Sequence, residues 1–293
     1  MIAAWERLAT AQVRGRPLAA TRVLYAIAAL ALLRANQRRF PVAFDPERMH
    51  IDWPVVGDHL QGLPPAGVAA LWIGGALLLL TGLVPRLGAA AVVIAAFSFY
   101  AVDRQHYGNG GYFVLLIGVL LVLADSGASA TPWGPDRRLA SWWPAFLLAA
   151  QLTITYSFAA VQKFRLPSLR GDTIAWQLHG PLVDHIGWSH LPIALNLLGG
   201  LTELFCAIGL WFAPTRKLAA AAGVGLHLGI LLFLRWSPDM AAFGFASVSL
   251  YPAFWAATQP LPGPDSRSAA AERSSPSSEA SPSPGHEVSQ ASR

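Results

Sequence analysis

The chain has 293 residues, of which 54% are hydrophobic and only 13% are charged, and its mean hydropathy is +0.43. An average soluble domain carries about a quarter charged residues, so this composition excludes an ordinary soluble domain and indicates a polytopic membrane protein. The net charge of +5 does not require a nucleic-acid partner, because excess Lys and Arg orient helices in a bilayer. Cys206 is the single cysteine, which excludes an intrachain disulfide and a multi-thiolate metal site.

Eight apolar segments follow along the chain. Each is long enough, or nearly so, for a spanning helix, which needs about 20 mostly apolar residues. The segments cover residues 18–34, 67–84, 87–102, 112–125, 142–162, 192–213, 217–236 and 240–257. The predicted fold class is therefore all-α, a polytopic integral membrane bundle of about eight transmembrane helices. The short fourth segment makes the range roughly seven to nine.

The chain divides into three expected parts. An amphipathic N-terminal lead-in covers residues 1–17, and the transmembrane domain covers 18–257. Residues 258–293 are rich in Pro, Ser and charge, so they cannot bury a core and are expected to be a disordered tail. In this interpretation four arginines precede the first helix and predict a cytoplasmic N-terminus: Arg7, Arg14, Arg16 and Arg22.

The connections differ between the two faces that eight spans would create. The second and sixth connections are tight turns, "VPRLG" and "APTRK". The odd-numbered connections are longer and more polar, with "FDPERMHIDWPVVGDHLQ" in the first and "DRQHYGNGG" in the third. Six of the eight histidines lie on that odd-numbered face: His50, His59, His106, His179, His185 and His190. Because loops carry function where a scaffold positions them, any chemistry is expected there.

The fifth segment ends on a lysine, in the stretch "ITYSFAAVQKFRLPSLRG". A lysine is normally protonated at neutral pH and cannot accept a proton. Burial in a low dielectric disfavours the ammonium, so Lys163 could become a free amine that acts as a general base. The alternative is an anchor whose head reaches back to the interface, as lysines near helix ends often do.

Two ionisable residues lie deep in later segments. "GGLTELFCAIGLWF" places Glu203 inside the sixth segment, and "GVGLHLGILLFL" places His227 midway along the seventh. Glu203 precedes the turn at Pro214 by about ten residues and His227 follows it by about thirteen, so their depths match at 1.5 Å rise per residue. The sequence therefore predicts a Glu203–His227 hydrogen bond, as a structural clasp or as a functional pair.

The third connection combines polar side chains with three glycines in "DRQHYGNGGYF". Glycine permits the tight backbone needed to re-enter the membrane, so His106, Tyr107 and Asn109 are either binding residues or parts of a helix-capping turn. The histidines of the fifth connection lack the i, i+4 spacing of a zinc helix, and no metal site is predicted.

Several of these stretches resemble the vitamin K-dependent gamma-carboxylases and their bacterial relatives, the horizontally transferred transmembrane (HTTM) domain. "YSFAAVQKFRLPSLRG" is similar to the helix that ends on that family's lysine, and "HYGNGGYFVLLIGVLLVLADSG" resembles its Asn-Gly-Gly entry into a helix. "LTELFCAIGLWFAPTRKLAAAAGVGLHLGILLFL" resembles its later helix pair, with a histidine in the second helix. The resemblance extends over residues 15–257 and depends on the order of short motifs.

The resemblance implies a specific chemistry. In the carboxylases the corresponding lysine deprotonates reduced vitamin K, oxygen converts the product to an epoxide, and the strong base so formed allows a glutamate to be carboxylated. Lys163 would then be the base, with His227 and Glu203 beside it as catalytic residues. The cofactor would be a reduced quinone of the vitamin K or menaquinone type. The substrate-binding residues would be His106, Tyr107, Asn109, Tyr156 and Arg170.

This sequence also departs from the family's pattern. Gln162 stands where the family has a paired lysine, and only the expected tail follows residue 257 in place of a large extramembrane domain. Full glutamate carboxylation is therefore not expected, and the activity, if present, would be lyase or monooxygenase chemistry on a quinol. The expected partners are the lipid bilayer and a quinone or lipid-like small molecule, with no nucleic acid. The expected location is a bacterial inner (cell) membrane.

Two other functions remain open at the level of sequence. One is a non-enzymatic membrane partner or assembly protein built on the same domain. The other is a quinone-linked oxidoreductase subunit of the DoxX type, although those proteins are generally shorter than this chain.

Overall fold

The computed structural model describes most of the chain, namely residues 10–48, 51, 53, 56–106, 108–136, 138–179, 181–235 and 237–261. Three sequence predictions lie outside these described residues: the role of Tyr107, the contribution of His50 to the polar face, and the disordered state of the tail from residue 262 onward. The first nine residues of the expected lead-in, with Arg7, also lie outside them.

A helix is present at each of the eight predicted apolar segments. They are α2 (Gly15–Asn36), α5 (Pro65–Thr81), α6 (Pro85–Val102), α7 (Asn109–Leu123), α8 (Trp142–Lys163), α12 (Leu191–Gly209), α13 (Ala213–Phe233) and the broken pair α14 (Pro238–Ser249) and α15 (Tyr251–Ala257). Six stretches are long and apolar enough to cross a membrane, the last of them being Asp239–Ala257. The apolar helices α5 and α7 are shorter, with 17 and 15 residues. The all-α membrane bundle is therefore confirmed, with six helices of spanning length in the described part of the chain.

Short elements fill the connections between the long helices. The first connection holds α3 (Phe40–Ala43) and α4 (Gly57–Leu60), and the third holds the 3₁₀ helix η1 (Arg104–His106). The fifth holds three short helices: α9 (Leu166–Leu169), α10 (Asp172–Ala175) and α11 (Pro181–Ile186). These structured connections all belong to the odd-numbered face.

The second connection shows how the sequence ends one helix and begins the next. α5 ends at Thr81 and is followed by Gly82, whose φ of 69° lies in the left-handed region that glycine adopts without steric cost. α6 then begins with Pro85 in its first turn, where the missing N–H costs nothing because no carbonyl precedes it within the helix. The predicted tight turn is confirmed.

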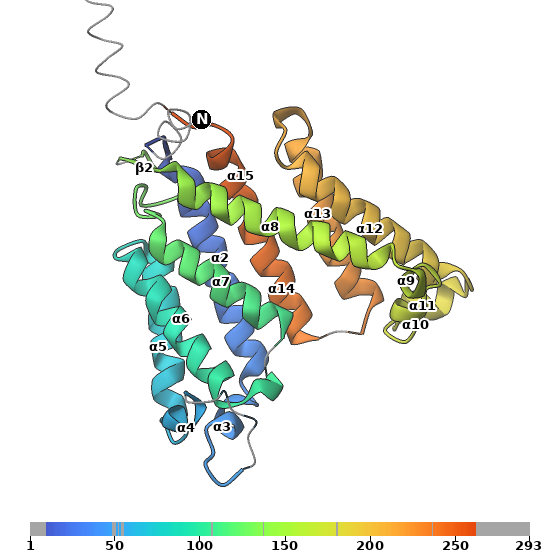
Figure 1. The fold of residues 1–293 in the computed structure, drawn as a ribbon, viewed down its shortest axis with the longest axis horizontal. Coiled ribbons are helices and arrows are strands. Elements are labelled where there is room, and N and C mark those ends of the chain that lie inside the picture. The colour runs from blue at the N-terminus through green and yellow to red at the C-terminus, as the bar shows by residue number, and fades with distance from the viewer. Residues whose placement is uncertain are drawn as a thin grey trace, which may run out of the picture.

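Two groups of helices make up the bundle (Figure 1). α5, α6 and α7 pack together with α2, whereas α12 packs against α8 and α13. Figure 1 shows α12 and α13 extending to the far side of α8, away from α5 and α6. The α14–α15 stretch links the groups, because α14 packs along α2 and α7 while α15 packs along α8 and α2.

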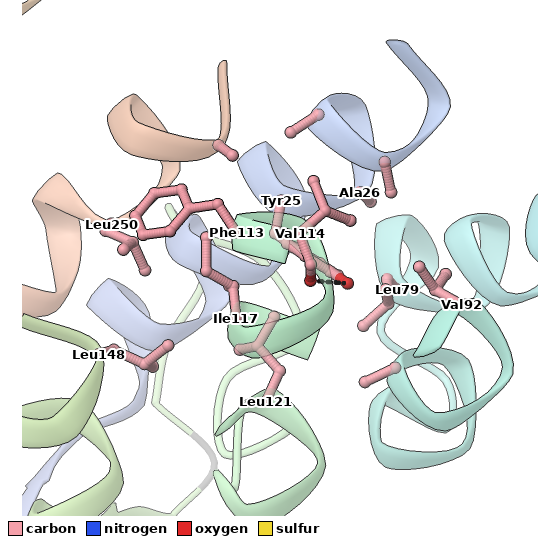
Figure 2. Packing of buried hydrophobic residues seen from close by; sticks show 14 of the residues in the cluster. Tyr25, Ala26, Leu79, Val92, Phe113, Val114, Ile117, Leu121, Leu148 and Leu250 are labelled. Atoms are coloured by element: carbon pink, nitrogen blue, oxygen red, sulfur yellow. Dashed lines mark hydrogen bonds between the residues drawn. The ribbon is translucent and has the colours of Figure 1, made fainter. Parts of the chain in front are cut away.

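The buried core of the first group is shown in Figure 2, where Phe113, Ile117 and Leu121 of α7 point toward neighbouring helices. Its one polar feature in this view is Tyr25 of α2, which is fully buried and donates a hydrogen bond of 2.9 Å to the carbonyl oxygen of Val114. A buried hydroxyl needs such a partner because the surroundings offer no water.

A two-stranded sheet joins the ends of the helical groups. β1 (Gln12–Arg14) pairs antiparallel with β2 (Leu139–Ser141), with Val13 opposite Ala140. Gln12 also forms a bridge with Leu261. The start of α2, the start of α8 and the chain beyond α15 therefore lie on one side of the molecule.

Arg22 corrects one sequence prediction. It does not precede the first helix but lies inside α2, with its side chain fully buried, and Arg16 also falls within α2, in its first turn. The Arg22 guanidinium donates to the carbonyl oxygens of Ser126 (2.5 Å), Ser129 (3.2 Å) and Ala130 (2.6 Å). Arg22 is therefore an internal brace for the fourth connection rather than a flanking charge that reports orientation.

Candidate functional site

The candidate site begins with an ion pair between α8 and α12. Lys163 is the last residue of α8, and its Nζ lies 2.6 Å from Oε1 of Glu203. The two side chains are 25% and 7% exposed, so the carboxylate is the deeper partner. Among the described residues, the second carboxylate oxygen of Glu203, Oε2, is buried without a hydrogen-bond partner. Such an unsatisfied acceptor is uncommon and calls for an explanation.

Two glycines of α12 allow the end of α8 to come this close. A methyl group at Gly200 would lie 3.2 Å from Cβ of Lys163, and one at Gly199 would lie 3.4 Å from its Cε. One turn earlier, Nδ2 of Asn196 donates a 2.9 Å hydrogen bond to the carbonyl oxygen of Lys163. This bond satisfies one of the carbonyls that every helix C-terminus leaves unpaired.

A second polar group lies deeper between the helices. The hydroxyl of Tyr156 on α8 lies 3.0 Å from Nε2 of His227 on α13 and 2.7 Å from the hydroxyl of Tyr251 at the start of α15. All three side chains are buried. Tyr156 is therefore the centre of a three-residue hydrogen-bond network that connects three helices.

The predicted Glu203–His227 hydrogen bond is wrong. Glu203 pairs with Lys163, and His227 pairs with Tyr156. The depth argument located both residues inside their helices, but it took account of only α12 and α13. α8 contributes a partner to each of them.

The ion pair and the network are neighbours in one polar column. Both are built between the same helices, because Lys163 and Tyr156 lie on α8, Glu203 lies on α12 and His227 lies on α13. Tyr156 and Lys163 are seven residues apart on α8, which is about two turns and about 10 Å along one helix face. The column thus runs from the loop-rich end of α8 into the bundle, and it is closed by α12, α13 and α15.

Two other predicted binding residues, His106 and Asn109, lie elsewhere. His106 is on η1, where it lies 3.6 Å from a carboxylate oxygen of Asp103 and stacks on Phe99. Asn109 is the first residue of α7, and Figure 1 shows this end of α7 apart from the end of α8. Arg170 follows α9 and is exposed. The structure brings Lys163, Glu203, His227 and Tyr156 together, but not His106 or Asn109.

The Asn-Gly-Gly motif has a packing role in this structure. The backbone N–H of Gly110 donates to Oδ2 of Asp239, at the start of α14, over 3.4 Å. A methyl group at Gly110 would lie 2.6 Å from Oδ1 and 2.7 Å from the backbone oxygen of Asp239. The third connection therefore meets the seventh at Gly110.

Sequence reasoning missed Tyr251 as a member of the network. Its signal was a tyrosine immediately before Pro252 in "SLYPAFW", at the point where the last apolar stretch breaks into α14 and α15. A polar side chain beside a helix break inside the membrane is a candidate partner for other buried polar groups.

The comparisons with known proteins agree with this architecture. The family model of the HTTM domain matches residues 16–254, which run from the first turn of α2 into α15 and make up more than half of the chain. The match covers nearly the same residues as the resemblance found from motifs. Neither the curated proteins nor the solved structures give a match. The chain belongs to the HTTM domain family.

Proposed function

We propose that this membrane protein is an enzyme that removes a proton from the hydroxyl of a quinol or another lipid-like molecule, with Lys163 as the base and Glu203 as its partner. The observation that carries the proposal is the buried carboxylate of Glu203, which holds Lys163 with one oxygen and has its other oxygen unsatisfied. A hydroxyl donor is the kind of group that such an oxygen lacks.

The ion pair explains how Lys163 could act as a base. As an ammonium it cannot accept a proton, but transfer of one proton from Nζ to Oε1 across 2.6 Å gives a neutral amine and a neutral acid. A low dielectric favours this uncharged form over two buried charges. The amine can then take up a proton at Nζ from a hydroxyl, and the resulting ammonium would stabilise the negative charge left on the ligand.

The ligand class comes from the resemblance to the carboxylases together with this geometry. A reduced quinone would supply both the hydroxyl and the electrons for a reaction with oxygen. Nζ is partly exposed at the loop-rich end while Oε2 is deep, so a ligand hydroxyl that enters from this end would reach the amine that takes its proton, next to a carboxyl group with one unused acceptor. Tyr156, His227 and Tyr251 extend the same polar column and would position the ligand rather than exchange its proton.

A structural clasp is the competing explanation of the ion pair. The Asn196 hydrogen bond already fixes the end of α8 to α12 without any charge. Removing one member of a buried ion pair lowers the free energy of unfolding, because the other charge is left buried and unpaired. Lys163 is partly exposed, so its ion pair contributes less to stability than a fully buried pair would. The Lys163–Glu203 charges are therefore assigned to chemistry rather than to holding the two helices together.

The test uses the fact that the chain has only two lysines, Lys163 and Lys217. Membranes that contain the protein receive reduced menaquinone, oxygen and bicarbonate, with and without a glutamate peptide, and epoxide formation is followed by mass spectrometry. Lys163→Ala and Lys163→Arg should each lower turnover by about 10²–10⁴-fold, the usual contribution of a general base. Lys217→Ala, at an exposed position near the start of α13, should leave turnover unchanged.

The arginine variant separates charge from proton transfer, because arginine keeps the positive charge but does not release its proton. Glu203→Gln should also lower turnover, since it removes the group that takes the proton from Lys163. Turnover equal to that of the wild-type protein in Lys163→Ala, at equal expression, would remove Lys163 from the mechanism.

A further inference from the structure

An apolar groove of about 710 Å³ lies on the first group of helices, away from the polar column. Its walls are the last turns of α2, with Leu30 and Leu33, and the first turns of α5, with Ala66 and Ile73. Phe40 of α3 also lines it. The volume is within the range of about 300–1,000 Å³ that is typical of small-molecule sites.

Arginines gather where this groove meets the loop-rich face. Arg34, in the last turn of α2, lines the groove together with Gln37. Arg38 and Arg39 follow directly, and all three arginines are exposed. Within the described residues, none of the three forms an ion pair with an acidic side chain of the chain itself. The mouth of the groove is therefore positively charged, while its walls are almost entirely apolar.

A groove of this kind matches one class of molecule. Its apolar walls lie between two membrane helices, where an unfilled space would forfeit van der Waals contacts. A hydrocarbon chain would restore those contacts, and a negatively charged head group would lie beside the arginines at the interface. The amide of Gln37 could donate a further hydrogen bond to a phosphate oxygen.

We propose that this groove binds an anionic phospholipid, with an acyl chain along α2 and α5 and its phosphate beside Arg34. The charge at the mouth selects the head group, and the apolar walls hold the chain. This site does not depend on Lys163, because the groove is formed by α2, α3 and α5, whereas Lys163 is at the end of α8. Figure 1 shows α5 and α9, which follows α8, at different ends of the molecule.

The experiment compares phosphatidylglycerol with phosphatidylcholine of the same acyl chains. The purified full chain is equilibrated with each lipid in mixed micelles, and retained lipids are counted by native mass spectrometry. The wild-type protein should retain phosphatidylglycerol in preference. Arg34→Gln should reduce that preference about fivefold, the effect expected for one arginine near an anionic lipid surface. Arg86→Gln, an exposed arginine at the start of α6, should leave it unchanged.

A second pair of variants tests the groove itself. Ala66→Phe puts an aromatic ring into the groove from an exposed position, so it should reduce retention of the lipid without disturbing the core. Ala221→Phe, at an exposed position on α13, is the matched control and should retain the lipid as the wild-type protein does.

Three results would overturn the proposal. The first is equal retention of both lipids by the wild-type protein. The second is unchanged retention in Ala66→Phe. The third is stronger retention of added menaquinone than of phosphatidylglycerol by the wild-type protein, with the menaquinone lost in Ala66→Phe, which would identify the groove as a quinone site instead.

Discussion

Tyr156 is the residue on which two buried hydrogen bonds between helices converge. Its hydroxyl forms hydrogen bonds with both Nε2 of His227 and the hydroxyl of Tyr251. In a soluble protein, water could replace a lost partner, but water is scarce inside a membrane bundle. The hydrogen bonds between these three helices would therefore not be replaced by water if one of them were lost.

The two tyrosines should differ in their effect on stability. Tyr251→Phe leaves Tyr156 bonded to His227, so we expect a loss of about 1 kcal/mol in the free energy of unfolding. Tyr156→Phe removes both bonds and leaves two buried polar atoms without partners, so we expect a loss of about 2–4 kcal/mol. Thermal unfolding of the purified protein in micelles measures both. An equal or larger effect of Tyr251→Phe would show that Tyr156 is not the central residue.

Two buried or partly buried cations show two ways of compensating a charge. Arg22 is surrounded by carbonyl oxygens that its fixed planar group can reach together. Lys163 has a carboxylate instead, and it is partly exposed. Carbonyl oxygens hold a cation in place but cannot accept its proton under ordinary conditions. The carboxylate of Glu203 can accept one, and this difference makes Lys163 the candidate for chemistry.

At the scale of helices, the sequence predicted a great deal because the signal is local. A run of apolar residues can be recognised without knowing what packs against it, so seven of the eight segments are single helices within a few residues of the predicted ends, and the eighth is the broken pair α14 and α15. The turn at Gly82 and Pro85 was equally visible. The partner of Glu203 and the burial of Arg22 could not be predicted in this way, because they depend on which helices are adjacent. The position of Arg22 inside an apolar run already indicated a buried, partnered side chain. Counting it among the arginines that predict the side of the N-terminus ignored that signal.

The contact between α7 and α14 gives a prediction at this scale. Gly110→Ala should lower the free energy of unfolding by about 1–3 kcal/mol, because the added methyl group would meet a backbone oxygen of Asp239 that cannot rotate away. Gly74→Ala is the matched control on α5, where an added methyl group has no atom within 4 Å. We expect Gly74→Ala to be neutral or to stabilise the helix by roughly 0.5–1 kcal/mol. Thermal unfolding in micelles compares the two.

A neutral Gly110→Ala would contradict the close approach of Asp239. The Asn-Gly-Gly motif would then have to be explained by ligand binding rather than by packing. Loss of epoxide formation in Gly110→Ala without loss of stability would support that alternative directly.

The whole molecule is constrained by its small sheet. β1 precedes α2 and β2 follows α7, so both strands must lie on the same side of the membrane. An even number of crossings therefore separates them. Because α2 and α6 have spanning length, α5 and α7 either both cross or both fail to cross. Trp72 and Leu79 of α5, like Phe113 and Ile117 of α7, are buried in the shared core, which favours crossing by both.

We therefore predict eight crossings, with the bilayer thinned locally at α5, whose 17 residues extend about 25 Å at 1.5 Å per residue. In a Cys206→Ser background, single cysteines replace four exposed residues, and an impermeant maleimide is applied to vesicles of each orientation. Cysteines at Leu83 and Trp133 should react from one side, and those at Ile51 and Trp176 from the other. If α5 and α7 do not cross, Leu83 will react from the same side as Ile51. That result would leave six crossings and place α5 along the surface, despite the burial of Trp72.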